Sequence, residues 1–240
     1  MGAFKSRKML LIRVGGFARV QIPMEITYLG HSSFRIKTKN ASVVTDPFDP
    51  KIVGLKYSGI EGEIVTISHG HLDHSEFAMV GGTKKVINGP GEYEISGVSI
   101  IGYPSFHDNK KGEERGKNTI YVYEVGGLRI AHLGDLGHTL SDDMINEMGA
   151  IDVLMIPVGG TYTIGPKEAV EIVGKISPNF VLPMHYKTPG MNEKEFGSLE
   201  PKETFLKEIG ITVEVLPKLI IKKGDITEDQ GTKVIVFEKA

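Results

Sequence analysis

The stretch Ser68-His69-Gly70-His71-Leu72-Asp73-His74 brings three imidazoles and one carboxylate together within a few residues. It directly follows the apolar run 63–68, whose composition predicts a β-strand. In an extended segment, residues two apart point the same way, so His69 and His71 can reach one metal ion, whereas Asp73 and His74 follow a bend and can face a second. These nitrogen and oxygen ligands suit Zn²⁺, Mn²⁺ or Fe²⁺. The alternative, a solvated polar loop, does not account for this spacing after a buried strand.

Three further candidate ligands each follow a predicted strand. His107 comes after the strand predicted over 98–103, Asp135 after 128–133, and His185 after 180–184. Strand ends that converge at one edge of a sandwich bring polar groups together without burying them in the core. Each residue alone would more often be structural, but beside the 69–74 cluster each becomes a candidate metal ligand.

Short strands with turn signals dominate the chain from Met24, and strands alternate with helices further on. Strands are predicted over 24–29, 33–38, 42–45, 63–68, 85–88, 93–95, 98–103, 119–125, 128–133, 152–156, 180–184, 218–222 and 233–237, and helices over 141–148, 166–176 and 201–209. This order suits two sheets packed face to face with helices outside. We expect residues 24–240 to form one domain, with 1–23 as either a loose N-terminal extension or an extra first strand.

Composition limits the classes of protein to consider. The 240 residues are 40 % hydrophobic and 24 % charged, which is typical of a soluble globular protein, and the net charge of -2 disfavours nucleic acid as the main partner. The absence of cysteine excludes disulfides, a thiol nucleophile and Cys-ligated metal. We expect a cytoplasmic protein without a membrane partner, because no stretch reaches the ~20 apolar residues that span a bilayer. An oligomer stays possible.

The motifs resemble the metallo-β-lactamase superfamily, whose signature is H-x-H-x-D-H. The ligand positions of that superfamily are matched in order by His69, His71, Asp73, His74, His107, Asp135 and His185. The segment Thr45-Asp46-Pro47 matches its first motif, and the stretches 29–34, 134–138 and 183–186 are similar to small metal-dependent hydrolases around the ascorbate-6-phosphate lactonases. The resemblance covers roughly residues 24–240. It implies an α/β fold, a four-layered αββα sandwich with two metals at its open edge.

The resemblance also implies how the ligands are shared. The first metal would be held by His69, His71 and His107, the second by Asp73, His74 and His185, and Asp135 would bridge the two. The cofactors are then two divalent ions, zinc first, with manganese or iron as alternatives. Metal binding can lower the pKa of a bridging water from 15.7 to about 7, which gives a hydroxide able to attack a carbonyl carbon or a phosphorus atom.

Other polar residues receive supporting roles. Asp73 can hold the water and take its proton. His138 either donates to the leaving group or caps the following helix, and His31 is a candidate for the lining of the site. His132 has the strand parity of a core histidine, and Asp46 is predicted to hydrogen-bond a ligand histidine or loop amides.

Substrate contacts are predicted after the last ligand and in a glycine-rich loop. Lys187 could pair with a phosphate or carboxylate beside Tyr186, or could simply be solvated. The loop 159–165, which contains Thr161, could offer backbone N–H groups to an anion. The charged loop 109–118 is either a lid that carries Arg115 and Lys117 or a plain surface loop.

Three functions are compatible with this pattern. The first is a metal-dependent hydrolase acting on a small, anionic ester, lactone or amide. The second is a phosphodiesterase acting on a nucleotide or nucleic acid. The third is a non-catalytic metal- or partner-binding module, against which the bridging Asp135 argues, because a retired site has no chemical need for it.

Overall fold

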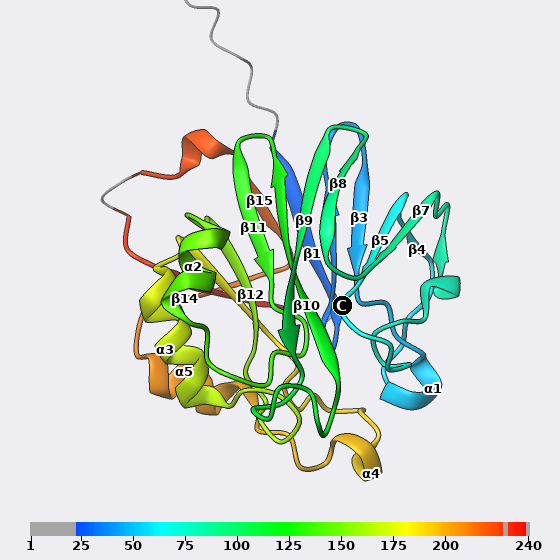
Figure 1. The fold of residues 1–240 in the computed structure, drawn as a ribbon, viewed down its shortest axis with the longest axis vertical. Helices are drawn as coiled ribbons and strands as arrows, with labels where there is room; N and C mark the ends of the chain where they lie inside the picture. The colour runs from blue at the N-terminus through cyan, green and yellow to red at the C-terminus, as the bar shows by residue number, and fades with distance from the viewer. Residues whose placement is uncertain (1–22, 228–229, 239–240) are drawn as a thin grey trace, which may run out of the picture.

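Two β-sheets packed face to face form the centre of the computed structural model, which describes residues 23–227 and 230–238 (Figure 1). One sheet consists, in spatial order, of β15 (Leu219–Ile221), β1 (Met24–Gly30), β2 (Ser33–Lys37), β3 (Ser42–Thr45), β5 (Ile64–Ile67) and β7 (Lys85–Asn88). The other consists of β14 (Val213–Leu216), β16 (Lys233–Phe237), β13 (Phe180–Met184), β12 (Val153–Pro157), β11 (Leu128–His132), β10 (Lys117–Val125), β9 (Val98–Phe106) and β8 (Gly91–Ile95). The predicted two-sheet sandwich is confirmed. The predicted extension lies, apart from Pro23, outside the described residues.

Side chains from both sheets interdigitate to form the main core. Phe34 and Ile36 of β2 are fully buried, as the two-residue period of a strand requires, and they pack in one cluster with Tyr121 and Tyr123 of β10. The buried tyrosine hydroxyls are satisfied across the sandwich. The Tyr123 hydroxyl forms a 2.7 Å hydrogen bond with Thr66 Oγ1, and Tyr121 donates to the Ile67 carbonyl at 2.9 Å. Both contacts attach the end of β5 to the opposite sheet.

Helices α2 (Asp142–Met148), α3 (Pro166–Ile176) and α5 (Lys202–Ile209) cover the outer face of the larger sheet (Figure 1). Helix α3 begins with Pro166 in its first turn and buries Ala169, Ile172 and Val173 on one face. Because helices cover one face and the core covers the other, β12 and β13 are buried along their whole length.

The outer face of the smaller sheet has a thinner cover. A short strand pair, β4 (Ile60–Glu61) with β6 (Val80–Gly81), packs over Val44, Val65 and Ile67. One-turn helices α1 (Pro50–Val53) and α4 (Glu193–Phe196) and 3₁₀ turns at Phe77–Met79 and Lys223–Asp225 complete the structure. These elements are absent from the sequence prediction, because a single turn or a two-residue strand shows too little periodicity, and β14 is absent from it as well. None of the helices in the described ranges is long and apolar enough to cross a membrane.

The strands that precede the candidate ligands all end at one edge of the sandwich. In the larger sheet, β11, β12 and β13 run parallel and β10 antiparallel to them, so β9, β11 and β13 finish together. In the smaller sheet, β3 and β5 run parallel to each other. Strand β2 is antiparallel to both β1 and β3, so β1 ends at the same edge as β3 and β5. A hydrogen bond of 2.9 Å from Thr119 N to the Ser68 carbonyl joins the two edges.

Candidate metal centre

One group of histidines gathers where β5 and β9 end. One ring nitrogen from each of His69, His71 and His107 lies within 4.8 Å of the others, which is the separation of atoms that can share one metal ion. His69 and His107 are buried, whereas His71 is exposed. This group has the composition predicted for the first metal.

A second group lies beside it. Asp73, His74 and His185 meet there within the same 4.8 Å limit, and His31 joins them. The His31 ring centroid lies 4.8 Å from that of His74 and 4.4 Å from that of His185, and its Nε2 lies 3.3 Å from Asp73 Oδ2. The structure therefore places His31 within the candidate centre itself, closer than a residue that only lines its mouth.

Asp135 lies between the two groups. Its Oδ2 is 3.3 Å from Nε2 of His74, 3.2 Å from Nε2 of His185 and 3.3 Å from Nε2 of His107. The same oxygen is 3.9 Å from Nε2 of His69. A single carboxylate oxygen thus faces nitrogens from both groups, which is the position that a bridging ligand requires.

Asp46 orients two of the histidines from behind. Its Oδ2 accepts hydrogen bonds from His74 Nδ1 at 2.9 Å and from Ser68 Oγ at 2.6 Å. Because the Ser68 hydroxyl proton points to Asp46, its oxygen is left to accept from His69 Nδ1, 3.0 Å away. Both imidazoles are then protonated at Nδ1 and present Nε2 to the centre, the tautomer that a metal ligand needs. Asp46 therefore contacts one candidate ligand histidine directly and a second through Ser68, a relay that the sequence did not reveal.

The electrostatics of the centre favour a bound cation. Burial alone would raise the pKa of Asp135, but His185 and His74 hold it well below its usual value. Burial alone would lower the pKa of His74, but Asp135 and Asp73 raise it well above the usual range, so the two carboxylates stabilise a positive charge at Nε2, the position that a metal ion would take. Burial lowers the pKa of His69 to about 3, which keeps this candidate ligand neutral. The buried atoms His69 Nε2, His74 Nε2 and Asp135 Oδ1 have no hydrogen-bond partner among the described residues, so the donor set fits metal ions.

The backbone is strained where the ligands converge. His31, Asp46 and His185 adopt left-handed conformations with φ of 53°, 38° and 52°. Such a conformation costs of the order of 1–3 kcal/mol for a non-glycine residue, and it persists where the surrounding structure imposes it. One contact that holds this conformation is the hydrogen bond that His185 N donates to the His31 carbonyl at 2.8 Å.

Gly134 and Asn118 position Asp135. Gly134 has φ of 56°, and a Cβ atom there would lie 2.5 Å from Ser68 Cβ and 2.4 Å from Asn118 Oδ1. Glycine therefore allows the Asp135 loop to pass directly against the His69 loop. Asn118 Oδ1 accepts from Asp135 N at 3.0 Å, while its Nδ2 donates to Ser105 Oγ and to a main-chain carbonyl. Asn118 was missed by sequence reasoning, since an isolated Asn in a strand carries no motif.

A family model covers the segment that forms this centre. The family model described as "Beta-lactamase superfamily domain" matches residues 25–185, from β1 to the last candidate ligand. The chain belongs to this superfamily. Among its relatives, the UPF0173 metal-dependent hydrolase of Thermococcus onnurineus is 32 % identical over 85 % of this chain and 99 % of its own length. That of Methanopyrus kandleri is 29 % identical over 85 % of this chain and its whole length.

Solved structures agree on the fold. A Thermotoga maritima protein, whose proposed activity is that of a Zn-dependent hydrolase of the metallo-β-lactamase superfamily, shares 38 % identity, with a TM-score of 0.70 over 90 % of this chain and 98 % of its own. Igni18, a metallo hydrolase from Ignicoccus hospitalis, is 21 % identical with a TM-score of 0.60 over 78 % of this chain and 91 % of its own, and shows the fold alone. The chain is a metal-dependent hydrolase by family. Its placement near the ascorbate-6-phosphate lactonases stays a prediction.

The two remaining histidines of this superfamily member contact the backbone. His132 is fully buried, donates from Nε2 to the Ser32 carbonyl at 2.8 Å, and accepts at Nδ1 from Gly134 N at 3.2 Å, which confirms a satisfied core histidine. His138 donates from Nδ1 to the Thr139 carbonyl at 2.8 Å and accepts at Nε2 from Phe106 N at 3.2 Å. Both ring nitrogens of His138 are thus occupied, which argues against donation to a leaving group. The helix cap is instead formed by Ser141.

A cavity of about 210 Å³ opens onto the centre. It is lined by Ile52, His71, Asp73, His107, Arg115, Asp135, Tyr162, His185, Glu195 and Phe196. The predicted substrate contacts lie elsewhere. Lys187 Nζ donates to Glu193 Oε2 at 2.7 Å and to the Gly197 carbonyl at 2.9 Å, and Tyr186 is buried against Tyr28. Thr161 donates from Oγ1 to the Ser198 carbonyl at 2.8 Å, so its hydroxyl does not face the cavity either. None of these three side chains therefore lines the cavity in this structure.

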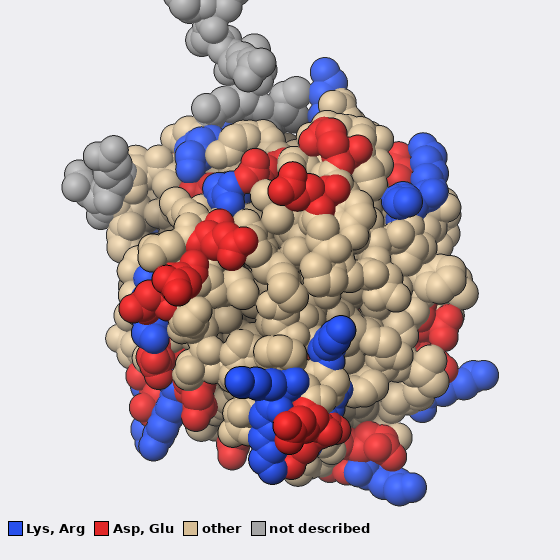
Figure 2. Space-filling model, viewed as in Figure 1, with Lys and Arg blue, Asp and Glu red and all other residues tan. Residues whose placement is uncertain are grey.

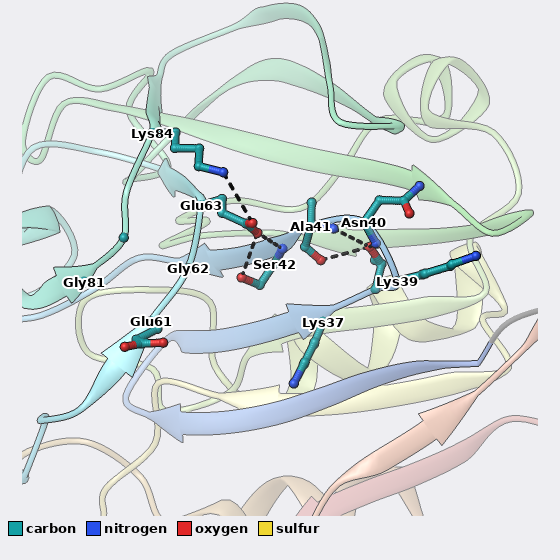
Figure 3. A pocket seen from close by; sticks show the side chains of 12 residues that line it. Lys37, Lys39, Asn40, Ala41, Ser42, Glu61, Gly62, Glu63, Gly81 and Lys84 are labelled. Atoms are coloured by element: carbon teal, nitrogen blue, oxygen red, sulfur yellow. Dashed lines mark hydrogen bonds and ion pairs between the residues drawn. The ribbon is translucent and has the colours of Figure 1, made fainter.

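A larger cavity of about 430 Å³ lies at the turn between β2 and β3 (Figure 3). Its charged lining consists of Lys37, Lys39, Glu61, Glu63 and Lys84. Glu63 accepts from the backbone N–H of the first residue of β3 at 2.8 Å and pairs with Lys84 at 3.7 Å. This lining offers no histidine and its best-placed carboxylate is already engaged, so the smaller cavity is the better candidate for chemistry.

Proposed function

We propose that this hydrolase holds two divalent ions, zinc first, and cleaves a small anionic ester, lactone or amide. The observation that carries the proposal is the position of Asp135 Oδ2, within 3.9 Å of nitrogens from both ligand groups. His69, His71 and His107 would hold one ion, and Asp73, His74 and His185 the other. Bound there, the ions would polarise the scissile carbonyl or phosphoryl group and acidify the attacking water.

The chain's own residues would orient that water. Asp73 lines the cavity, and although burial alone would raise its pKa, His74 and His31 hold the pKa well below its usual range. A carboxylate that stays ionised accepts a hydrogen bond from water well but is a weak base. We therefore assign Asp73 the role of orienting the water by a hydrogen bond, and not chiefly that of accepting its proton as a general base. His31, 3.3 Å from Asp73, would fix the carboxylate in that orientation.

The surface favours a small substrate over a polymer. On the face shown in Figure 2, acidic and basic side chains are intermixed around an uncharged centre. A protein that binds the phosphate backbone of a nucleic acid usually presents a continuous basic surface, and the net charge here is -2. A 210 Å³ cavity also suits a small molecule.

The test combines metal content and turnover on one sample. Elemental analysis of the purified protein should give about two metal ions per chain, and chelation should abolish hydrolysis of a 4-nitrophenyl ester and a simple lactone. Asp135→Asn should lose at least one ion and most of the turnover, whereas Lys84→Gln, in the other cavity, should match the wild type. Turnover of bis(4-nitrophenyl) phosphate alone would favour a phosphodiesterase. One ion or none, without turnover, would favour a binding module.

A further inference from the structure

We propose that Arg115 binds an anionic group of the substrate, a carboxylate or a phosphate, at the cavity of the metal centre. This inference deepens the proposed function and rests on it. Arg115 is the cationic side chain among the residues that line the cavity of the metal centre. It shares that lining with Asp73, Asp135 and the ligand histidines, so a group bound to it would lie beside the scissile bond.

The guanidinium of Arg115 lies over an aromatic ring and is not paired with a carboxylate among the described residues. Its Cζ lies 4.9 Å from the centre of the Tyr162 ring, and its Nη2 lies 3.5 Å from the Thr161 carbonyl. Within the described residues, no carboxylate oxygen lies within 4.0 Å of it, although other surface cations of this chain form such pairs. A guanidinium that lies over an aromatic ring without a carboxylate partner keeps N–H donors free, and these suit two-point binding of a carboxylate or phosphate.

Asp108 builds the loop that carries Arg115. Its Oδ1 accepts from the backbone N–H groups of Lys110 and Gly112, both at 2.8 Å. Its Oδ2 accepts from those of Glu114 at 3.0 Å and Arg115 at 2.7 Å. One carboxylate therefore satisfies four amides of a single turn. Those hydrogen bonds hold the pKa of Asp108 below its usual range, although burial opposes them.

The same loop is joined to the metal centre. His107 N donates to the Gly116 carbonyl at 3.0 Å, so the candidate ligand and Arg115 lie at the two ends of one closed turn. A loop already folded in this way loses little conformational freedom when a substrate binds. This structure favours a fixed wall of the site over the mobile lid that the charge of segment 109–118 suggested.

The other residues that line the cavity limit further the class of substrate that fits. Ile52 and the buried Phe196 supply apolar surface, while Glu195 adds a carboxylate that would repel a second anionic group. The ligand class that fits is a small ester, lactone or amide with one carboxylate or phosphate and a short apolar segment.

The experiment compares two esters that differ in one charge, mono(4-nitrophenyl) glutarate and its methyl ester. In the metal-loaded wild type, the anionic ester should have the higher kcat/KM. Arg115→Gln should lower kcat/KM for the anionic ester by about tenfold or more, mostly through KM, and leave the neutral ester within about twofold. Lys117→Gln, which removes a nearby positive charge outside the cavity, is the matched control and should change neither. Equal losses for both esters in Arg115→Gln, or no loss, would overturn the proposal.

A binding measurement separates this inference from the proposed function. Propionate and ethyl phosphate are titrated separately, by calorimetry, into metal-loaded wild type and metal-loaded Arg115→Gln. The variant should bind at least one of the two anions about tenfold more weakly than the wild type does. The anion whose affinity falls is the kind of group that Arg115 binds. If the wild type hydrolyses neither ester but Arg115→Gln weakens binding, the anion site stands and the proposed hydrolysis of such esters fails. If neither anion binds, or binding does not depend on Arg115, the anion site is refuted.

Discussion

Replacing Asp46 by asparagine should weaken metal binding and also lower the stability of the metal-free protein. The carboxylate accepts three hydrogen bonds, from Ser68 N at 2.8 Å, Ser68 Oγ at 2.6 Å and His74 Nδ1 at 2.9 Å. Asparagine is almost the same size, but one of its two terminal atoms is a donor. Either orientation of the amide therefore places an N–H against at least one of these donors.

The magnitude follows from those contacts. A mismatched buried polar pair costs roughly 1–3 kcal/mol, so the free energy of unfolding of the metal-free protein should fall by about that amount. His74 can relieve the clash by moving its proton to Nε2, but this tautomer cannot bind metal. Loss of such an orienting partner typically weakens metal binding by about 10–100-fold, which is about 1.4–2.8 kcal/mol.

The assay is zinc competition against a chromophoric chelator, combined with urea unfolding of the metal-free protein. Asp152→Asn is the matched control, because Asp152 is also buried and accepts from Arg129 N at 2.8 Å and Lys223 Nζ at 2.7 Å, away from the centre. It should lose stability but retain zinc affinity. Wild-type zinc affinity in Asp46→Asn would refute the orienting role.

Other perturbations test the remaining parts of the centre. Gly134→Ala should destabilise the protein and lower its metal content, because the added Cβ would lie 2.4 Å from Asn118 Oδ1 at a positive φ; unchanged melting and metal content would contradict this close packing. Asp108→Asn should lower the melting temperature at pH 7. The pKa of Asp108 is lower in the folded protein than in the unfolded chain, so its carboxylate contributes its full stabilisation above the usual aspartate pKa of about 3.9 and loses it as the pH falls below that value. The melting difference should therefore shrink in acid, and a constant difference would show that the carboxylate charge is not involved. Chelation should lower the melting temperature of the wild type, since metal binds the folded state, and an unchanged temperature would show that the centre binds no metal.

Most of the fold and most of the candidate ligands could be predicted from local sequence patterns. Strands 42–45, 85–88, 180–184 and 233–237 and the helix 166–176 have the predicted bounds, because their apolar periodicity and flanking turn residues are local signals. The H-x-H-x-D-H spacing follows from the geometry of one short segment. The later candidates could be named because a polar residue after a buried strand lies at a sheet edge, whichever strands are neighbours.

Only the tertiary structure decided which residues meet across the site. His31 joins the second ligand group, and Ser68 links Asp46 to His69, because strand order and left-handed turns bring separate segments to one point. Lys187 follows a candidate ligand in sequence yet pairs with Glu193, whereas Arg115 reaches the cavity from a loop closed by its own hydrogen bonds. Side-chain direction after a strand depends on the path of the loop and on its long-range partners, and neither is encoded in spacing along the chain.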